Sequence, residues 1–397
     1  MLLAIAICPL ALPRWWESNR NKLAVAAVLG LPIVALYLAR RPGALVAMAQ
    51  EYVSFVIPLA GLYVISSGIL LRGDLVATPL TNTAFLAIGS ILASFVGTTG
   101  ASMLMVRPLL QTNRERARVR HTVIFFIFLV SNIGGMLTPL GDPPLFLGYL
   151  QGVPFTWTFR LWLPWLTMVA TLLAVYFVWD TVEYTHESLA ALRRDRAQVE
   201  PLRIRGALNV LWLGLVVMAV ALLSAPWREV AIIVLAGAWF WSTPAHIRRA
   251  NGVTASPMIE VAVLFFGIFL TMIPALELLR LRGHELPVRE PWQFFWASGL
   301  LSSFLDNAPT YLTFLALGQG LRLAPEVAGV PHAILAAISV GSVSMGANSY
   351  IGNAPNFMVK AVAEEAGVKM PSFFGYMGYS LAVLIPLFVA VTWVFFL

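Results

Sequence analysis

The sequence has a single cysteine, Cys8, among its 397 residues. One cysteine excludes an intrachain disulfide and any metal site built from several cysteines. The five histidines, at positions 121, 186, 246, 284 and 332, are scattered and lack the spacing of metal ligands. The sequence contains no recognisable nucleophile–base pair, so we expect no enzyme activity and no cofactor beyond a coupling ion.

Charge is also scarce. Charged residues make up 11% of the chain and hydrophobic residues 59%, with a mean hydropathy of +0.81. Soluble domains typically carry roughly 25% charged residues. The composition therefore predicts an all-α polytopic membrane protein without a large soluble domain. The net charge of +7 does not indicate nucleic-acid binding, because the basic residues lie in short loops between apolar spans, where they orient the protein and contact anionic lipid.

Apolar segments long enough to cross the bilayer recur along the chain, since about 20 apolar residues span it as a helix. The segment 2–12 is short, but it lacks a basic region and an A-x-A cleavage site, so we interpret it as a short or clipped first span rather than a signal peptide. The predicted spans are 2–12, 22–39, 51–71, 121–150 (broken), 157–180, 207–224, 228–243, 257–280, 330–366 (broken) and 372–396.

One of these segments, 330–366, has an unusual centre: residues 341–356 are rich in Gly, Ser and Asn and contain Pro355. Gly and Pro interrupt a helix, and Asn and Ser bond to the freed backbone groups. In lipid such a break persists only where protein or a wet cavity covers it. We therefore predict a discontinuous helix that binds a substrate or ion at the bilayer midplane. A helix–loop–helix between two short spans is the alternative.

Two further apolar segments, 79–111 and 291–319, have polar, turn-forming centres. The centre of the first is Gly97-Thr98-Thr99-Gly100 and that of the second is Asp306-Asn307-Ala308-Pro309. Each segment predicts a re-entrant hairpin that returns to the side from which it came. The alternative is a pair of full spans joined by a tight loop.

The two halves of the chain repeat each other. Residues 93–98 align with 302–307 at an offset of 209 (303 − 94), and 141–146 with 352–357 at an offset of 211 (352 − 141). Each half, 51–180 and 257–397, then runs span, hairpin, broken span, span, and crosses the membrane three times. Because two linking helices in 207–256 separate the halves, we expect inverted-topology repeats, which support alternating access in secondary transporters.

Basic residues set the predicted orientation. Lys and Arg number 16 in the odd-numbered loops and 7 in the even-numbered loops, which makes the odd loops cytoplasmic and places both termini outside. Residues 1–50 form N-terminal scaffold helices, and 181–206 form a basic cytoplasmic loop with a surface helix in its mixed-charge stretch, 187–200.

The two hairpin centres and the two broken helices form four interruptions, which are expected to bring polar residues to membrane depth. Asp142, Asn307 and Asn353 each stand shortly before a proline, which is typical of a helix start, so each is both a candidate N-cap and a candidate ligand. Helix N-termini aimed inward favour an anion, whereas free carbonyls and hydroxyls suit Na⁺. The candidate substrate- or ion-binding residues are Thr98, Thr99, Ser102, Asn132, Thr138, Asp142, Asp306, Asn307, Thr310, Ser344, Asn348, Ser349 and Asn353. The helix-breaking residues are Gly97, Gly100, Gly141, Pro143, Pro144, Pro309, Gly346, Gly352 and Pro355.

Asp142 and Asp306 are the two acids predicted nearest the midplane. A carboxylate at that depth is costly and therefore a functional candidate, able to release a proton as it takes up a cation. In the alternative interpretation both are satisfied helix caps. Lys360 is long enough to reach the membrane interface, or it faces an anionic substrate.

At these motifs the sequence resembles the ion transporter superfamily, which includes divalent anion/sodium symporters, citrate/metal symporters, arsenite exporters and NhaD-type sodium/proton antiporters. It is most similar to the branch of citrate transporters and sodium:proton antiporters. The resemblance covers about residues 50–397 and rests on three stretches of sequence: 97–102, 303–310 and 346–356, with a small addition from 359–364.

The resemblance implies a homodimer with a scaffold and a mobile transport domain, and a Na⁺ site at each hairpin tip with its paired break. Na⁺ is then expected at Thr98, Asp142, Asp306, Asn307, Asn348 and Asn353. The Ser-Asn-Thr signature with which dicarboxylate symporters hold a substrate is absent from both tips, and Asp306-Asn307 stands in one of those places.

From this sequence we expect a secondary active transporter of the bacterial inner membrane that exchanges Na⁺ for H⁺, with Asp142 and Asp306 as titrating ligands. The alternative is Na⁺- or H⁺-coupled transport of an organic anion such as citrate or a dicarboxylate. A passive channel is disfavoured by the broken helices.

Overall fold

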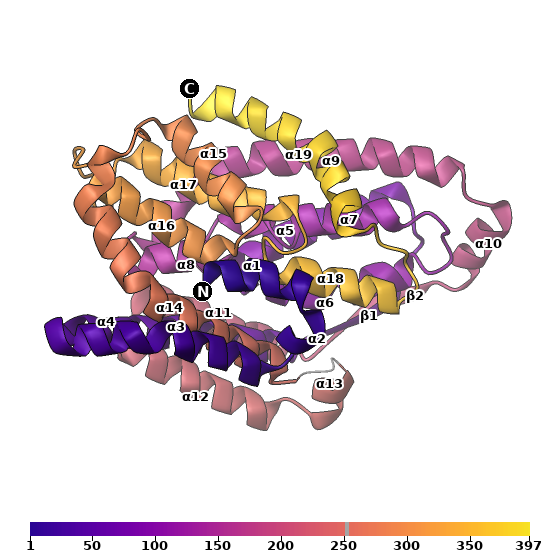
Figure 1. The fold of residues 1–397 in the computed structure, drawn as a ribbon. Coiled ribbons are helices and arrows are strands. Elements are labelled where there is room, and N and C mark those ends of the chain that lie inside the picture. The colour runs from indigo at the N-terminus through magenta and orange to yellow at the C-terminus, as the bar shows by residue number, and fades with distance from the viewer. Residues whose placement is uncertain (251–253) are drawn as a thin grey trace.

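The computed structural model describes residues 1–250 and 254–397, and the protein is an all-α membrane protein with one short two-stranded ribbon (Figure 1). Among these residues, six long helices are apolar enough to cross a membrane. They are α3 (Asn19–Arg40), α4 (Pro42–Ser66), α5 (Pro79–Val96), α9 (Trp162–Thr185), α14 (Ser256–Arg282) and α19 (Phe373–Phe395). Helix α5, the first arm of the hairpin predicted at 79–111, is thus itself long and apolar enough to cross the membrane.

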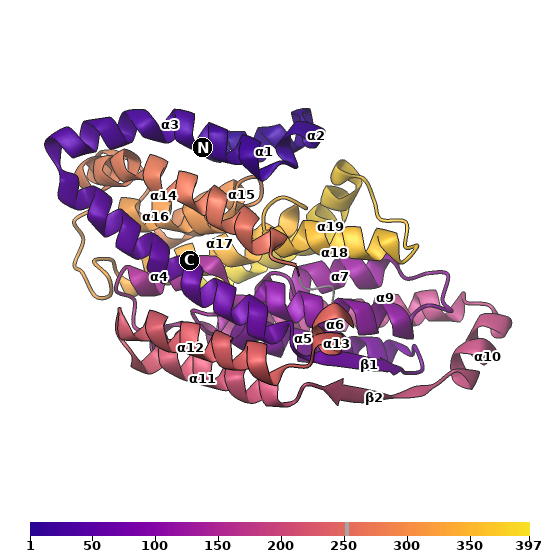
Figure 2. The same ribbon diagram turned by 90° about the horizontal axis from the view of Figure 1, so that it is seen from below.

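The N-terminal helices form one side of the molecule. The short helices α1 (Leu2–Ala11) and α2 (Pro13–Trp16) precede α3, which lies against α14 (Figure 2). Lys22 Nζ on α3 forms a 2.6 Å ion pair with Glu260 on α14, and the Tyr37 hydroxyl donates to Glu277 at 2.8 Å. These pairs join the first segment of the chain to the start of its second half.

The same order of elements occurs in both halves. The first half runs α4, α5, α6 (Thr98–Thr112), α7 (Arg120–Leu129), α8 (Pro143–Leu150) and α9; the second runs α14, α15 (Pro291–Ser302), α16 (Asn307–Gly320), α17 (His332–Met345), α18 (Ala354–Glu365) and α19. Short 3-10 turns at Ile133–Met136, Phe155–Leu161, Gly283–Glu285 and Gly346–Asn348 complete them. The inverted relation of the two halves stays a prediction.

The linking segment contains one feature that the sequence did not predict. The expected span 51–71 ends at Ser66, and β1 (Leu70–Asp74) pairs antiparallel with β2 (Glu200–Arg205). The surface helix expected in 187–200 is α10 (Leu189–Ala197), where the Asp195 carboxylate accepts from the Ala77 amide at 3.1 Å. The link continues through α11 (Leu208–Leu222), α12 (Trp227–Ser242) and α13 (Ala245–Ala250).

The interior is built around α7 and α17. Every residue from His121 to Leu129 is buried, and so is every residue from Ala337 to Tyr350. A helix that is apolar on all sides is stable only when other helices surround it. Both helices end inside the protein, so their broken ends are covered by other segments rather than by lipid.

Candidate functional site

Each buried helix stops in the middle of the fold and a second short helix follows. Helix α7 ends at Leu129 and α8 starts at Pro143, while α17 ends at Met345 and α18 starts at Ala354. The two restarts are 211 residues apart (354 − 143). The two predicted broken helices are therefore interrupted in the structure.

Glycine allows the chain to cross itself tightly within each break. A Cβ added at Gly141 would collide with the backbone of Gly135, and one added at Gly352 would collide with the backbone of Gly346. These glycine pairs also lie 211 residues apart (346 − 135 and 352 − 141). Both breaks therefore contain a backbone crossing that a larger residue cannot occupy.

A serine of each preceding hairpin arm holds the break in place. Ser94 Oγ donates to the Gly134 carbonyl at 2.5 Å and accepts from the Leu137 amide at 3.1 Å, and the Thr138 hydroxyl donates to the Ser94 carbonyl. These bonds satisfy backbone groups that the missing helical turn leaves free. Thr138, a predicted ligand, therefore fastens the break to α5.

The second half repeats this arrangement at Ser303. Its hydroxyl donates to the Met345 carbonyl at 3.1 Å and accepts from Asn348 Nδ2 at 2.9 Å, while Ser349 Oγ donates to the Ser303 carbonyl at 2.5 Å. Asn348 and Ser349 thus fasten the second break to the hairpin. Ser94 and Ser303 lie in the aligned stretches of sequence, but the sequence analysis did not include either of them as a site residue.

The carboxylate of Asp142 lies where the four interruptions meet. Its Oδ1 accepts from the Thr98 hydroxyl at 2.8 Å and from Asn353 Nδ2 at 3.0 Å, and its Oδ2 accepts from Asn307 Nδ2 at 2.5 Å. Thr98 begins α6, Asn307 begins α16 and Asn353 precedes α18. The structure thus brings together one predicted residue from each hairpin and each break.

These four side chains, Thr98, Asp142, Asn307 and Asn353, are called the Asp142 cluster, and they form two equivalent pairs. Thr98 and Asn307 are the first residues of α6 and α16, the predicted second hairpin arms, and lie 209 positions apart (307 − 98). Asp142 and Asn353 directly precede the second half-helices and lie 211 positions apart (353 − 142). The single acid of the cluster therefore has an amide as its counterpart in the other half.

The expected helix caps are partly wrong. Asp142 and Asn353 occupy N-cap positions, but neither side chain bonds to its own helix, because both are used in the cluster. The cap of α16 is Asp306, which accepts from the Ala308 amide at 3.0 Å, and not Asn307. Asp142 is therefore not a satisfied cap, whereas Asp306 is one.

Four helix N-termini converge on this place, because α6, α8, α16 and α18 all begin at residues of the cluster or next to them. Each contributes partial positive charge from its free amides. A cavity of about 70 Å³ lies beside them and is lined by Thr98, Thr99, Asp306 and Asn353 together with residues of α4 and α14. The arrangement can stabilise negative charge inside the protein.

The chain was compared with known proteins on this basis. A model of the family described as "Putative citrate transport" matches residues 1–396. The chain belongs to this family. It is therefore a transporter, in agreement with its resemblance to the ion transporter superfamily. A search of curated proteins found no significant match.

Other buried polar side chains of the protein form hydrogen bonds around the Asp142 cluster. Asn353 Nδ2 also donates to the Ser131 carbonyl at 3.0 Å, and the Ser131 and Ser102 hydroxyls are 2.8 Å apart. Asn132 Nδ2 donates to Asn356 Oδ1 at 2.7 Å. Asn356 lies in the broken segment 341–356 but is not among the residues predicted as ligands. Its two amide hydrogens bond to the Gly346 and Ser349 carbonyls, so it supports the second break.

Some predicted ligands make only local bonds. Ser344 Oγ donates to Val340 within its own helix, and Thr310 Oγ1 donates to the Asp306 carbonyl. Lys360 lies 2.7 Å from Glu364 and over the rings of Tyr350 and Phe357. Lys360 is therefore already paired and does not contact Asp142.

Within the described residues, three buried asparagine oxygens have no hydrogen-bond partner: Oδ1 of Asn132, Asn307 and Asn348. An unpaired buried acceptor is costly unless something binds to it. Carbonyl and carboxylate oxygens are the ligands of hard cations. Asn307 Oδ1 belongs to the same amide that donates to Asp142, so an unpaired amide oxygen and a carboxylate lie next to each other.

Proposed function

We propose that the protein is a secondary active transporter of an organic anion such as citrate, coupled to the movement of H⁺ or Na⁺, with Asp142 as the residue that takes up the coupling cation. The observation that carries the proposal is the environment of Asp142. Its side chain is 1% exposed and bonds to Thr98, Asn307 and Asn353. All three donors are neutral.

A carboxylate in this position needs a cation. Among the side chains that the structure describes, no Lys, Arg or His forms an ion pair with Asp142. Buried charges are costly unless they are paired. Binding H⁺ or Na⁺ would remove the negative charge, and the unpaired Oδ1 of Asn307 supplies a neighbouring ligand.

The identity of the cargo rests on the family description, citrate transport, and on the four helix N-termini that surround Asp142. With Asp142 negative, these termini already face an anion. Once a cation neutralises Asp142, the same amides and hydroxyls favour a carboxylate of the substrate. In this way uptake of the cation and of the anion depend on each other.

The test is uptake of labelled citrate by purified protein in proteoliposomes under imposed Na⁺ or pH gradients. We expect gradient-driven uptake that falls at least about 10-fold in Asp142→Asn, equivalent to about 1.4 kcal/mol. The substitution removes the titratable charge and leaves an amide against Asn307. Undiminished coupled uptake by this variant would contradict the role of Asp142.

Sodium/proton antiport is the second candidate, and a specific observation favours it. No cationic side chain contacts the cluster in the described residues, so no Lys or Arg there would bind a carboxylate of the cargo directly. Na⁺-driven proton movement without citrate, lost in Asp142→Asn, would identify this function. The same assay with citrate added distinguishes the two candidates.

The working cycle that we propose is alternating access by inverted halves, with the hairpins α5–α6 and α15–α16 and their paired broken helices as the moving part. The shared element order and the matched Ser94 and Ser303 contacts support this proposal. A bacterial inner-membrane location, external termini and a homodimer belong to the same proposal.

A further inference from the structure

Three cavities lie along α4 and α6 between the Asp142 cluster and the surface. The cavity beside the cluster shares Tyr63 and Gly100 with a smaller one of about 30 Å³. That smaller cavity shares Met103 and Arg107 with a surface hollow of about 700 Å³. Each cavity is therefore adjacent to the next.

The narrow part of this series is at Gly100. A Cβ at this position would lie 3.2 Å from Ser66 Oγ of α4. Helices α4 and α6 therefore approach closely there, and a side chain at position 100 would narrow the gap further. This constriction separates the cluster from the outer cavity.

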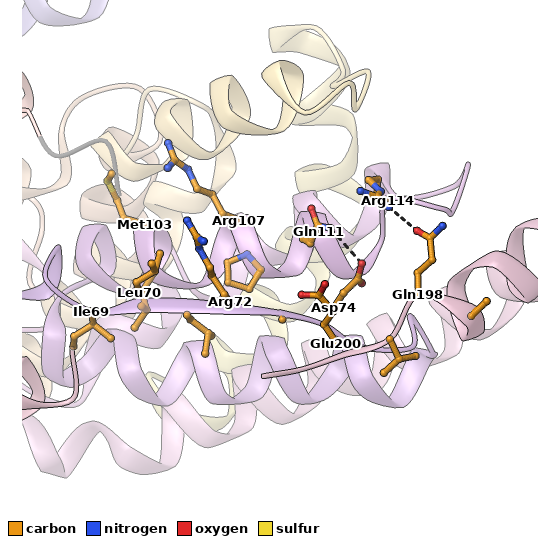
Figure 3. A pocket seen from close by; sticks show the side chains of 16 residues that line it. Ile69, Leu70, Arg72, Asp74, Met103, Arg107, Gln111, Arg114, Gln198 and Glu200 are labelled. Carbon is orange, nitrogen blue, oxygen red and sulfur yellow. Dashed lines mark hydrogen bonds between the residues drawn. The ribbon is translucent and has the colours of Figure 1, made fainter. Parts of the chain in front are cut away.

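Charged side chains line the outer hollow. In Figure 3, Arg72 and Arg107 lie toward the end near Met103, and Asp74 and Glu200 lie toward the other end, where Arg114 donates to Gln198 at 2.7 Å. Arg72 and Arg107 are exposed, and neither forms an ion pair within the described residues. Arg107 also lines the smaller cavity.

We propose that Arg72 and Arg107 capture the carboxylates of a polyanionic substrate at the mouth of a path that runs between α4 and α6, past Gly100, to Asp142. The identity of the anion rests on the proposed function, whereas the path does not. Two guanidinium groups that line one hollow can bind two carboxylates of one molecule, so tricarboxylates are favoured over monocarboxylates. The positive mouth also raises the arrival rate of anions, and salt reduces this effect.

The path can be tested by thiol labelling, because the only native cysteine is Cys8. In a Cys8→Ala background, Met103→Cys places a thiol where the surface hollow and the smaller cavity adjoin, and Ser66→Cys places one in the smaller cavity next to Gly100. Purified protein is treated with a sulfonate-bearing or a trimethylammonium-bearing methanethiosulfonate. We expect both thiols to react, and the anionic reagent to react faster at Met103→Cys.

The role of the arginines is tested by adding Arg72→Gln and Arg107→Gln. The anionic reagent should then react about 10-fold more slowly at Met103→Cys and the cationic reagent faster. Arg194→Gln is the matched control, since Arg194 is an exposed arginine on α10 outside the hollow, and it should leave both rates unchanged. Equal effects of all three substitutions would overturn a specific capture site.

Citrate should protect Met103→Cys from labelling, and acetate at equal ionic strength should not. Protection by anionic phospholipid instead of citrate would assign the arginines to a lipid headgroup and overturn substrate capture. Absence of citrate protection with labelling intact would overturn capture by the arginines and leave the path standing, whereas the citrate cargo itself is decided by the uptake assay. An unreactive Ser66→Cys beside a reactive Met103→Cys would refute the path itself.

Discussion

At the scale of single residues, the two acids Asp142 and Asp306 make different hydrogen bonds. Asp142 bonds to three side chains of other segments and not to its own helix, whereas Asp306 caps α16 through the Ala308 amide. The sequence correctly indicates that both belong to the breaks. It does not indicate which acid caps a helix, because Asp306 and Asn307 are adjacent and both residue types are good N-caps.

Because only Asp306 caps a helix, replacing Asp306 by Asn should have a different effect from replacing Asp142 by Asn. Asp306→Asn should keep coupled transport within about three-fold and keep stability within about 0.5 kcal/mol, because Asn caps a helix as well as Asp does. Asp306→Ala should cost about 1 kcal/mol through the lost cap. Thermal unfolding in detergent and the proteoliposome assay measure both effects. Abolished transport in Asp306→Asn with unchanged stability would show that this carboxylate is itself a coupling residue.

Thr98 offers a graded test of the cluster. Thr98→Val removes one of three donors to Asp142 and keeps the shape of the side chain. A net hydrogen bond to a charged group contributes about 1.5–3 kcal/mol. We expect the apparent affinity for the coupling ion to change about 10-fold, while Thr98→Ser, which keeps the hydroxyl, stays close to the native value. Ion titrations of transport rate measure the change, and equal behaviour of the two variants would contradict it.

At the scale of elements, the breaks are predictable and the ribbon is not. A Gly-, Asn- and Pro-rich stretch inside an apolar span leaves few structures open to it in lipid. The β1–β2 ribbon joins Leu70–Asp74 to Glu200–Arg205, more than 100 residues apart, and all of β2 is exposed. Neither strand has a strong alternating pattern, so no local signal predicts the pairing.

The backbone crossings within the breaks give a prediction for stability. Gly141→Ala places a Cβ against the Gly135 backbone, which cannot move without opening the break. We therefore expect the free energy of unfolding to fall by about 2 kcal/mol or more, with a lower unfolding temperature. The matched control is Gly378→Ala on α19, where nothing lies within 4 Å of the added Cβ. That substitution should be neutral or stabilise the helix by up to about 1 kcal/mol. A stable, active Gly141→Ala protein would contradict the crossing.

At the scale of the whole molecule, the Asp142 cluster connects the two halves of the chain. Asp142 receives bonds from Asn307 and Asn353, both of the second half, and from Thr98 of its own half. The sequence offsets predict that 98, 142, 307 and 353 are equivalent in pairs. They cannot predict that the side chains bond to one another, because that depends on how the halves dock.

The equivalence of positions 142 and 353 predicts that the carboxylate can be moved from the first position to the second. In the double variant Asp142→Asn with Asn353→Asp, the carboxylate returns to the cluster from the other half, and the amide introduced at position 142 can donate to it across the 3.0 Å contact that now joins the two side chains. The exchanged carboxylate would face the Ser131 carbonyl, so recovery should be partial. We expect coupled transport at least about 10-fold above that of Asp142→Asn alone, measured with the single variants as a double-mutant cycle. If the double variant is no more active than the single one while unfolding at the same temperature, position 353 does not share the role of position 142, and the two halves do not contribute equivalent ligands to one site.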